Sequence, residues 1–348
     1  MRSAYEAFGL VTRLRRSQAL DPSATADGFF SPSVGFALFW QLDYLPLPHE
    51  RPSLAATRML RLAIPNKGRL NEDTRSLLAD AGLEVRASSE RALVANLGGE
   101  FEAIFVRAQD IAEFVADGAA DAGITGWDLV QESARPIESL LDLGFGRCRL
   151  VVATKDDSAI RSLADIAPGA RVATVFPRIT ERFFQSQGLR IELVPVSGAV
   201  EIAPHLGIAD VILDLTSTGS TLKVNGLREM VTVLESTAHL VVAGEQSGRA
   251  PTGERRRTLD ELVAALRSVL AARGQRYVMA NVPRERLDEV RRILPGISGP
   301  TVIDVMNGGS KVAVHAVCPA DGIYRTLNAL KAIGAEGILV TRIERILA

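Results

Sequence analysis

The sequence predicts an α/β protein with a two-lobed main region and a smaller ferredoxin-like module at its C-terminal end. From residue 59 to residue 275, apolar strand-like runs alternate with amphipathic helix-like segments, which is the pattern of layered α/β domains. From Gln275 onward the order becomes strand, helix, strand, strand, helix, strand, the ferredoxin-like order. With 348 residues, of which 47% are hydrophobic, the chain can bury two or three separate cores.

Charge and cysteine usage exclude several classes of function. Lysine and arginine number 40 against 41 acidic residues, so no global field attracts nucleic acid or an anionic membrane. Any anion site must therefore be local. Cys148 and Cys318 lie far apart without metal-ligand spacing, and we interpret both as buried thiols in a reducing compartment. The four histidines pair with no cysteine or carboxylate at a ligand spacing, so the sequence predicts no protein metal cluster.

Residues 1–58 differ from the rest of the chain. They hold eight of its 18 aromatic residues, and no helical or strand period runs through them. The apolar run "FALFW" is too short to span a bilayer, and no secretory signal pattern occurs, so we expect a cytoplasmic protein without a membrane anchor. An organelle transit peptide is disfavoured by Glu6, Asp21 and Asp27. We interpret 1–58 as a disordered extension or as the product of an upstream start codon, with Met59 as the natural start.

The first lobe is predicted to comprise residues 59–146 together with 238–275. Its first elements are a strand "LRLAIP", a helix ending at Gly82, a strand through Phe105, a helix from Asp110, a strand "AGIT" and a helix after Gly126. Such alternation predicts a parallel sheet that binds ligands at the carboxyl ends of its strands. The lobe closes with a strand "HLVVAG" and a helix "LDELVAALRSVLAARG". Between these two, "GEQSGRAPTGERRRT" is predicted to be a loop with solvated arginines.

The second lobe is predicted to span residues 147–237. Its elements are a strand in "RCRLVVATK", a strand in "ARVATVF", a helix "ITERFFQSQG", a strand "IELVPV", a helix "AVEIAPHLGI" and a strand ending in "ADVIL". Because the chain enters this lobe and then returns to the first, two strands should cross between the lobes. Two lobes joined by crossing strands form a hinged cleft, the architecture of periplasmic binding proteins.

A hydroxyl-rich loop, "DLTSTGSTL", follows the last strand of the second lobe. Thr216, Ser217, Thr218, Ser220 and Thr221 supply hydroxyl donors, and Gly219 lets the backbone turn so that successive N–H groups point inward. A helix N-terminus behind the loop adds partial positive charge, so the combination suits a phosphate. An ordinary turn with a Ser or Thr helix cap is the structural alternative. No "GK" follows, which excludes a Walker-type nucleotide loop.

The segment from Glu201 to Leu222, "EIAPHLGIADVILDLTSTGSTL", resembles the signature of the ATP phosphoribosyltransferases, the family that opens histidine biosynthesis. The resemblance extends through "PNKGRL" and "VRAQDIAEFVADGAADAGITG" and covers essentially everything from Met59 onward. The module at residues 276–348 resembles the ACT-like, histidine-binding regulatory domain of the family's long form. Residues 1–58 have no counterpart in the family pattern.

The resemblance implies attack of adenine N1 of ATP on C1 of phosphoribosyl pyrophosphate, with pyrophosphate leaving. The hydroxyl-rich loop of Asp214 and residues 217–221 would hold the 5′-phosphate of the phosphoribosyl donor. Glu201 and Asp214 would lie near the ribose hydroxyls or the cationic C1 that develops in the transition state. The alternative for these two carboxylates is structural, with Asp214 capping the loop and Glu201 on a helix surface.

The resemblance also implies an ATP side, a metal and an effector. Lys67, Gly68 and Arg69, together with Arg107 at a strand end, are candidates to bind the phosphates of ATP or the leaving pyrophosphate. Lys67 and Arg69 are thereby candidate catalytic residues beside Glu201 and Asp214. Mg²⁺ is expected as the companion of pyrophosphate, bound chiefly through substrate oxygens and water. Histidine is the expected allosteric inhibitor, and dimers that assemble into hexamers are the expected oligomers.

One alternative comes from another class of protein. A two-lobed small-molecule binding protein, such as a solute receptor or an effector-sensing domain, would show the same order of strands and helices without any chemistry. The absence of a secretion signal and of a DNA-binding helical module argues against it, as does the presence of the full signature with the C-terminal module.

Overall fold

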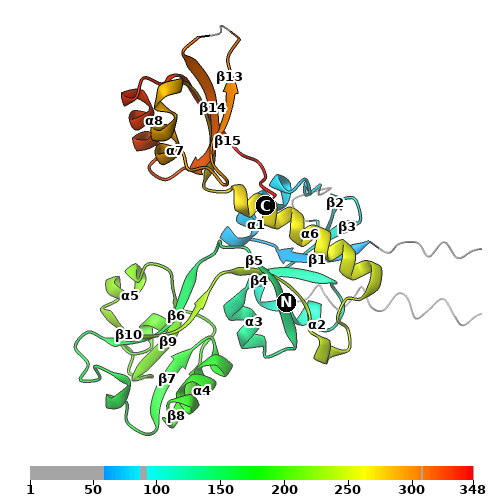
Figure 1. The fold of residues 1–348 in the computed structure, drawn as a ribbon. Helices are drawn as coiled ribbons and strands as arrows, with labels where there is room; N and C mark the ends of the chain where they lie inside the picture. The colour runs from blue at the N-terminus through cyan, green and yellow to red at the C-terminus, as the bar shows by residue number, and fades with distance from the viewer. Residues whose placement is uncertain (1–58, 87–91, 307–308, 348) are drawn as a thin grey trace, which may run out of the picture. The chain divides into compact units, whose positions relative to one another are not determined.

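The computed structural model describes residues 59–86, 92–306 and 309–347. The chain divides into two compact units, Met1–Ser53 and Leu54–Ala348, and every described residue belongs to the second. The predicted extension 1–58 therefore lies outside the described residues. Three sheets organise the described part of the chain, and Figure 1 shows them with their helices.

The first lobe contains a six-stranded sheet in the order β2-β3-β1-β4-β11-β5. Its strands are β1 (Leu60–Pro65), β2 (Val94–Gly98), β3 (Phe101–Val106), β4 (Ala122–Gly126), β5 (Ile137–Asp142) and β11 (Ala238–Ala243). Its helices are α1 (Arg69–Asp80), α2 (Ile111–Ala116), α3 (Trp127–Ser133) and α6 (Gly253–Ala272).

The predicted parallel sheet is correct for β1, β3 and β4 only, because the sheet as a whole is mixed. β1 runs parallel to β3 and β4, but β2 is antiparallel to β3, and β11 is antiparallel to both β4 and β5. The physical reason lies in the connections. A tight turn at Gly98 and Gly99 forces β2 and β3 into a hairpin. β11 comes back from the second lobe and needs no helical crossover to reach β4.

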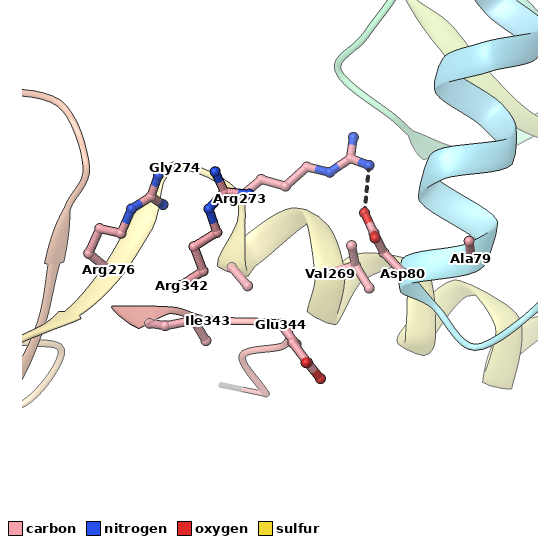
Figure 2. Close-up of a pocket in the computed structure, with 10 residues that line it drawn as sticks. Ala79, Asp80, Val269, Arg273, Gly274, Arg276, Arg342, Ile343 and Glu344 are labelled. Carbon is pink, nitrogen blue, oxygen red and sulfur yellow. Dashed lines mark hydrogen bonds and ion pairs between the residues drawn. The ribbon is translucent and has the colours of Figure 1, made fainter. Parts of the chain in front are cut away.

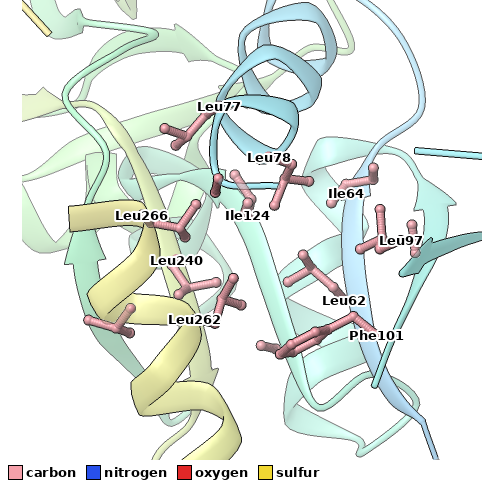
Figure 3. Close-up of a cluster of buried hydrophobic side chains, with 14 of the residues drawn as sticks. Leu62, Ile64, Leu77, Leu78, Leu97, Phe101, Ile124, Leu240, Leu262 and Leu266 are labelled. Atoms are coloured by element: carbon pink, nitrogen blue, oxygen red, sulfur yellow. The ribbon is translucent and has the colours of Figure 1, made fainter. Parts of the chain in front are cut away.

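The core of the first lobe is a layer of leucines between the sheet and two helices (Figure 3). Leu62, Ile64, Ile124 and Leu240 of the strands meet residues of α1 and α6, all almost fully buried, namely Leu77, Leu78, Leu262 and Leu266. Ala63 points to the opposite face, where Ile111 and Val115 of α2 cover it, because neighbouring residues of a strand alternate between faces. Burial on both faces explains why "LRLAIP" is a continuous apolar run.

The second lobe contains a five-stranded sheet in the order β10-β6-β9-β7-β8. Its strands are β6 (Cys148–Lys155), β7 (Ala170–Thr174), β8 (Ile191–Pro195), β9 (Val211–Thr216) and β10 (Leu227–Ser236), and its helices are α4 (Pro177–Ser186) and α5 (Ser220–Val224). β7 is parallel to β8 and β9, whereas β6 is antiparallel to β9 and β10.

Two predicted element boundaries need correction. The helix predicted in "AVEIAPHLGI" is a single 3-10 turn, Val200–Ile202, because Pro204 lacks a backbone N–H and Gly207 turns the chain at φ +70°. The loop predicted before α6 ends earlier than expected, since α6 already begins at Gly253. The arginine run 255–257 is therefore helical, and Arg255 pairs with Asp121 at 3.0 Å.

The predicted crossing between the lobes is present as a pair of antiparallel strands. β5 continues into β6, and β10 continues into β11, so the two connections lie side by side (Figure 1). The pairs Cys148 with Ser236 and Asp142 with His239 flank the crossing. Between them, the Leu143 amide donates to the Ala238 carbonyl at 2.9 Å. The crossing is thus a hydrogen-bonded ribbon rather than a loose linker.

A buried polar pair braces this ribbon. Ser236 Oγ donates to Asp128 Oδ1 at 2.6 Å and accepts the Asp128 amide at 2.9 Å. Burial raises the pKa of Asp128 despite these hydrogen bonds. Cys148 is half-buried rather than buried as predicted, and burial together with the Asp128 charge raises the pKa of its thiol to about 11. The thiol is therefore protonated and unreactive at neutral pH.

The C-terminal module has the predicted ferredoxin-like order. Its elements are β12 (Gln275–Pro283), α7 (Leu287–Ile293), β13 (Thr301–Asp304), β14 (Lys311–Pro319), α8 (Ile323–Ala332) and β15 (Glu336–Arg342). The sheet order is β13-β14-β12-β15 and every pairing is antiparallel. Val290 of α7 and Leu330 of α8 cover one face of the sheet, and Cys318 is buried there as predicted. Among the described residues, no helix has the length and apolarity to cross a bilayer.

Candidate active site between the two lobes

A pocket of about 650 Å³ lies between the two lobes. The first lobe contributes Gln109, Glu113 and Glu132 from its 3-10 turn and from α2 and α3, and the second lobe contributes Phe176, Arg178, Ala199 and Asp214. Its size is in the range of small-molecule sites. Of the residues predicted for the site, Asp214 lines this pocket, whereas the loop 217–221 and the residues at 67–69 and 107 do not. Glu201 does not line it either, so the structure brings only Asp214 of the predicted residues into this pocket.

Asp214 is the titratable group that the pocket perturbs most clearly. It lies near the end of β9, half-buried, and its Oδ1 accepts the Leu215 amide at 2.8 Å. Burial raises its pKa to about 6, the Leu215 amide opposes that rise, and the Glu201 charge adds to it. Glu201 and Asp214 are therefore close enough to interact electrostatically, as expected for two carboxylates at one site.

The hydroxyl-rich loop forms a tight turn into α5. Gly219 stands at the start of this short helix with φ +76°, a conformation that favours glycine. Its amide donates to Thr216 Oγ1 at 2.8 Å, and Thr218 Oγ1 lies 2.8 Å from Ser220 Oγ. The first amides of a helix have no intrahelical acceptor; that of Ser220 makes only a long contact of 3.4 Å to Thr218 Oγ1. Such amides are suited to bind an anion. Ser217, Thr218, Ser220 and Thr221 are exposed, whereas Gly219 is buried.

Glu229 of β10 packs directly against this turn. A Cβ atom at Gly219 would lie 2.5 Å from Glu229 Oε1. Arg149 holds the same carboxylate, with Nη1 3.0 Å from Oε2. Sequence reasoning missed both residues. Arg149 lies far from the loop along the chain, and Glu229, on the strand that follows α5, carries no local signal that it turns back onto Gly219.

The candidate ATP residues gather at the carboxyl edge of the first lobe's sheet. β1 and β3 are parallel, with Pro65 opposite Val106, and the Asn66 amide donates to the Val106 carbonyl at 2.8 Å. The turn at Lys67 and the turn at Arg107 therefore leave the sheet side by side. Lys67, Gly68 and Arg69 are exposed, and Gly68 has φ +79° and ψ −178°, which only glycine adopts readily.

Both arginines of this edge have local acidic neighbours. Arg69 Nε is 4.0 Å from Asp73 Oδ2, and Arg107 Nε is 2.7 Å from Asp110 Oδ2. All of these side chains reach solvent, so such pairs contribute little to stability and leave the arginines available to a ligand.

A clasp between α3 and α4 joins the lobes beside the pocket. Glu132 of α3 accepts the amides of Arg178 and Ile179, the first turn of α4, at 3.0 Å each. In return, Arg178 donates to the Glu132 carbonyl at 3.2 Å, and Arg182 donates to the Gln131 carbonyl at 2.6 Å. The amides at the start of α4 and the carbonyls at the end of α3, which lack partners within their own helices, thus form hydrogen bonds with the opposite lobe. Only the folded arrangement reveals this clasp.

Strained backbone flanks the same pocket. Ala134, at the end of α3, has φ 54°, and Ala199, which lines the pocket, has φ 51°. A positive φ costs an alanine about 1 kcal/mol or more. Such strain concentrates at functional sites, where the surrounding structure overrides local preference.

Comparisons with known proteins agree with this geometry. The family model of ATP phosphoribosyltransferase (HisG) matches residues 107–268, and the model of the HisG C-terminal domain matches residues 272–345. An ATP phosphoribosyltransferase of Gemmatimonas aurantiaca is 68% identical over 294 residues, covering 83% of this chain and all of the relative. The chain belongs to the ATP phosphoribosyltransferase family. It is therefore a pentosyltransferase, and the alternative of a non-catalytic binding protein is wrong.

Two further comparisons extend the family membership. An ATP phosphoribosyltransferase of Methanothermobacter thermautotrophicus is 45% identical over 289 residues, covering 83% of this chain and 99% of the relative. Among solved structures, the ATP phosphoribosyl transferase (HisG:HisZ) complex from Thermotoga maritima matches with a TM-score of 0.53 and 29% identity. That match covers 61% of this chain and 99% of the solved chain.

Because its pKa is raised, Asp214 should make the free energy of unfolding depend on pH, and its contribution should fall as pH rises. Between about pH 4 and pH 6 the folded state keeps a proton that the unfolded state has lost, so the Asp214 contribution to stability falls as pH rises through this window. Asp214→Asn should therefore melt higher than the wild type at pH 8 and gain nothing at pH 4. Thermal melts across this range measure the difference.

Asp210 is a matched control of opposite sign. Hydrogen bonds from Arg171 lower its pKa, so it stabilises the fold above its unfolded pKa and loses that contribution as pH falls. Asp210→Asn should melt lower than the wild type at pH 8. If Asp214→Asn and Asp210→Asn shifted the melting temperature equally, burial would not disfavour the ionised form of Asp214, and this account would be contradicted.

The clasp predicts local protection of the first turn of α4. Removing a cap of this kind costs about 1 kcal/mol, so Glu132→Ala should expose the Ile179 amide and speed its hydrogen exchange roughly 5-fold. Glu181→Gln, an exposed position on the same helix, is the control and should leave this exchange unchanged. Unaltered exchange at Ile179 in Glu132→Ala would show that the clasp does not form in solution.

Proposed function

We propose that the enzyme joins adenine N1 of ATP to C1 of phosphoribosyl pyrophosphate and releases pyrophosphate, the first step of histidine biosynthesis. Family membership supports the reaction class, and the interlobe pocket with Asp214 is the observation that supports its location. The attacking nitrogen is neutral and already nucleophilic, so the enzyme mainly aligns two anionic substrates and stabilises the departing pyrophosphate. No covalent nucleophile is needed. Both substrates are cytoplasmic metabolites, which supports a cytoplasmic location.

The second lobe holds the phosphoribosyl donor in this proposal. Hydroxyls of Ser217, Thr218, Ser220 and Thr221 and the first amides of α5 surround its 5′-phosphate, with Gly219 forming the turn. The amide of Gly219 already donates to Thr216, so the role of this glycine is to permit the turn rather than to donate. This arrangement uses the anion preference of a helix N-terminus.

Asp214 and Glu201 face the ribose. Both are half-buried and interact electrostatically, and the pKa of Asp214 is about 6 in the absence of substrate. A cationic C1 or a ribose hydroxyl favours the ionised carboxylate, so substrate relieves part of the cost of burying it. The two carboxylates therefore stabilise the positive charge that develops as the bond to pyrophosphate breaks.

The first lobe holds ATP and the leaving group. Lys67, Arg69 and Arg107 extend from one edge of the sheet, and Gly68 lets the backbone approach a phosphate closely. Removing one such donor typically costs about 3 to 4 kcal/mol of transition-state stabilisation. Glu132 and Arg178 hold the two lobes at the distance that this alignment requires.

Mg²⁺ fits this donor set as a companion of pyrophosphate. Magnesium prefers oxygen ligands and retains water, and the site offers one or two carboxylates, Asp214 and Glu201, beside substrate oxygens. Among the described residues, no group of three or more His, Cys, Asp or Glu forms a metal cage. When bound, the ion neutralises negative charge on the pyrophosphate oxygens.

Histidine is the proposed inhibitor, and residues 276–348 its sensor. This stretch has its own core and its own complete sheet. We also propose a homo-oligomer, with dimers assembling into hexamers. Inhibition then requires histidine to favour a less active arrangement of lobes or subunits, a coupling that is typically about 1 to 3 kcal/mol.

Loss of the turn at Gly219 tests the donor site. Gly219→Val places a β-branched residue at φ +76° and drives its side chain toward Glu229, so donor affinity should fall at least about tenfold while ATP binding is spared. Calorimetry with each substrate and a pyrophosphate-release assay with ATP, donor and Mg²⁺ measure these effects. Gly188→Val is the control, because Gly188 has φ +70° at the end of α4, outside the loop. Unchanged donor affinity in Gly219→Val would refute the loop assignment.

Removing the C-terminal module tests the sensor. Histidine should inhibit the full chain in a way that saturating substrate does not abolish, because it binds outside the cleft. A chain ending at Gly274 that still releases pyrophosphate should be insensitive to histidine. Inhibition of equal potency in the shortened chain would place the histidine site in the catalytic cleft instead.

A further inference from the structure

A second pocket lies where the first lobe meets the C-terminal module, with a volume of about 520 Å³ (Figure 2). The ends of α1 and α6, the start of β12 and the segment after β15 line it. Three of its side chains are arginines, Arg273, Arg276 and Arg342, and we call it the arginine pocket. None of its lining residues lines the interlobe pocket, so it is separate from the candidate active site.

Arg276 and Arg342 are forced together by strand pairing. They are direct partners in the antiparallel ladder between β12 and β15. Like charges directly opposite each other on neighbouring strands destabilise a sheet. Figure 2 shows both guanidinium groups extending toward Gly274 from the two strands. Because the register places both residues opposite each other, an anion between the two guanidinium groups would relieve this repulsion.

The acidic groups of the pocket do not supply this counter-charge. The carboxylate of Asp80 already pairs with Arg273, since Arg273 Nη2 lies 3.2 Å from Asp80 Oδ2. Glu344 extends away from Arg276 and Arg342, as Figure 2 shows. Arg276 donates to the carbonyl of its neighbour Gln275 at 2.7 Å, and within residues 59–86, 92–306 and 309–347 the guanidinium group of Arg342 has no hydrogen bond or ion pair. Neither acidic side chain that lines the pocket therefore pairs with Arg276 or Arg342.

We propose that the arginine pocket binds a small multivalent oxyanion, either a phosphate ester or a polycarboxylate. Each guanidinium is a planar fork that donates two parallel hydrogen bonds to phosphate or carboxylate oxygens. The volume is in the range of small-molecule sites. The ligand supplies negative charge between Arg276 and Arg342, which strand pairing places opposite each other.

The position of the pocket gives such a ligand a structural effect. After β15 the chain runs back to the first lobe, where the Ile346 amide donates to the Ser268 carbonyl of α6 at 2.9 Å and Arg345 donates to the Asp80 carbonyl at 3.2 Å. An anion bound by Arg276 and Arg342 lies between these strands and the end of α6. It therefore stabilises the joint between the first lobe and the C-terminal module.

A purely structural role makes the opposite prediction about stability. Arginines near the C-terminal ends of α1 and α6 would stabilise those helix ends through their dipoles. In that case, removing Arg276 and Arg342 should lower the melting temperature in every buffer. If they form an anion site, their removal relieves repulsion and should leave the melting temperature unchanged or higher when no multivalent anion is present.

The test uses the full chain in low-salt buffer free of multivalent anions. Citrate and inorganic phosphate are titrated separately into the wild type, the double variant Arg276→Gln/Arg342→Gln, and the control Arg267→Gln, an exposed position on α6. Melting temperature and calorimetric affinity are measured for each. Turnover with ATP and phosphoribosyl pyrophosphate should be the same for all three proteins in the absence of added anion. The turnover measurement shows whether anion binding at the arginine pocket is independent of catalysis, so failure of this proposal can be distinguished from failure of the proposed reaction.

We expect citrate or phosphate to raise the melting temperature of the wild type and of Arg267→Gln, and to bind the double variant at least about tenfold more weakly. Dependence of citrate binding on the two arginines identifies a polycarboxylate site, and dependence of phosphate binding alone identifies a phosphate-ester site. The proposal is overturned if the double variant binds both anions as tightly as the wild type. It is also overturned if that variant melts lower without anion.

Discussion

The rest of the structure depends on the hydrogen-bonded crossing of two strands between the lobes. Because β5 continues into β6 and β10 continues into β11, both lobes share one short antiparallel ribbon, with Ser236 and Asp128 bracing it. The ribbon joins the two lobes at one side of the interlobe pocket, and the contacts of Glu132 with α4 join them beside it.

This constraint divides two highly charged substrates between two surfaces. Phosphates repel each other, so an enzyme that joins two phosphate-bearing molecules benefits from separate cationic or amide-rich sites that meet at the reacting atoms. In our proposal the turn at Lys67 serves one substrate and the loop at Gly219 serves the other. The Glu132 clasp with α4 connects the two lobes through helix ends, and its two charged side chains, Glu132 and Arg178, form part of the pocket lining.

Sequence reasoning succeeded where local pattern determines structure. Apolar runs such as "LRLAIP", the ferredoxin-like order and the glycine turn at Gly219 follow from periodicity and backbone conformation, and each is present. It failed where distant segments decide. Strand direction in the sheet of the first lobe, the contact of Glu229 with Gly219 and the Glu132 clasp depend on residues brought together by tertiary packing. The 3-10 turn at Val200–Ile202 has a local cause, since Pro204 and Gly207 end the helix that the apolar pattern predicts. No local signal marks Arg276 and Arg342 as strand partners either.

Hydrogen exchange in the presence of each substrate alone tests the central claim most directly. The account predicts that phosphoribosyl pyrophosphate with Mg²⁺ slows exchange of the amides from Asp214 to Val224. It predicts that ATP with Mg²⁺ slows exchange around Asn66 to Arg69 and Arg107 and leaves the first segment unchanged. The pyrophosphate of the donor also reaches the first lobe in this account, so the segment from Asp214 to Val224 decides the test. Protection of that segment by ATP alone, or no protection of it by phosphoribosyl pyrophosphate, would contradict the division of the cleft proposed here.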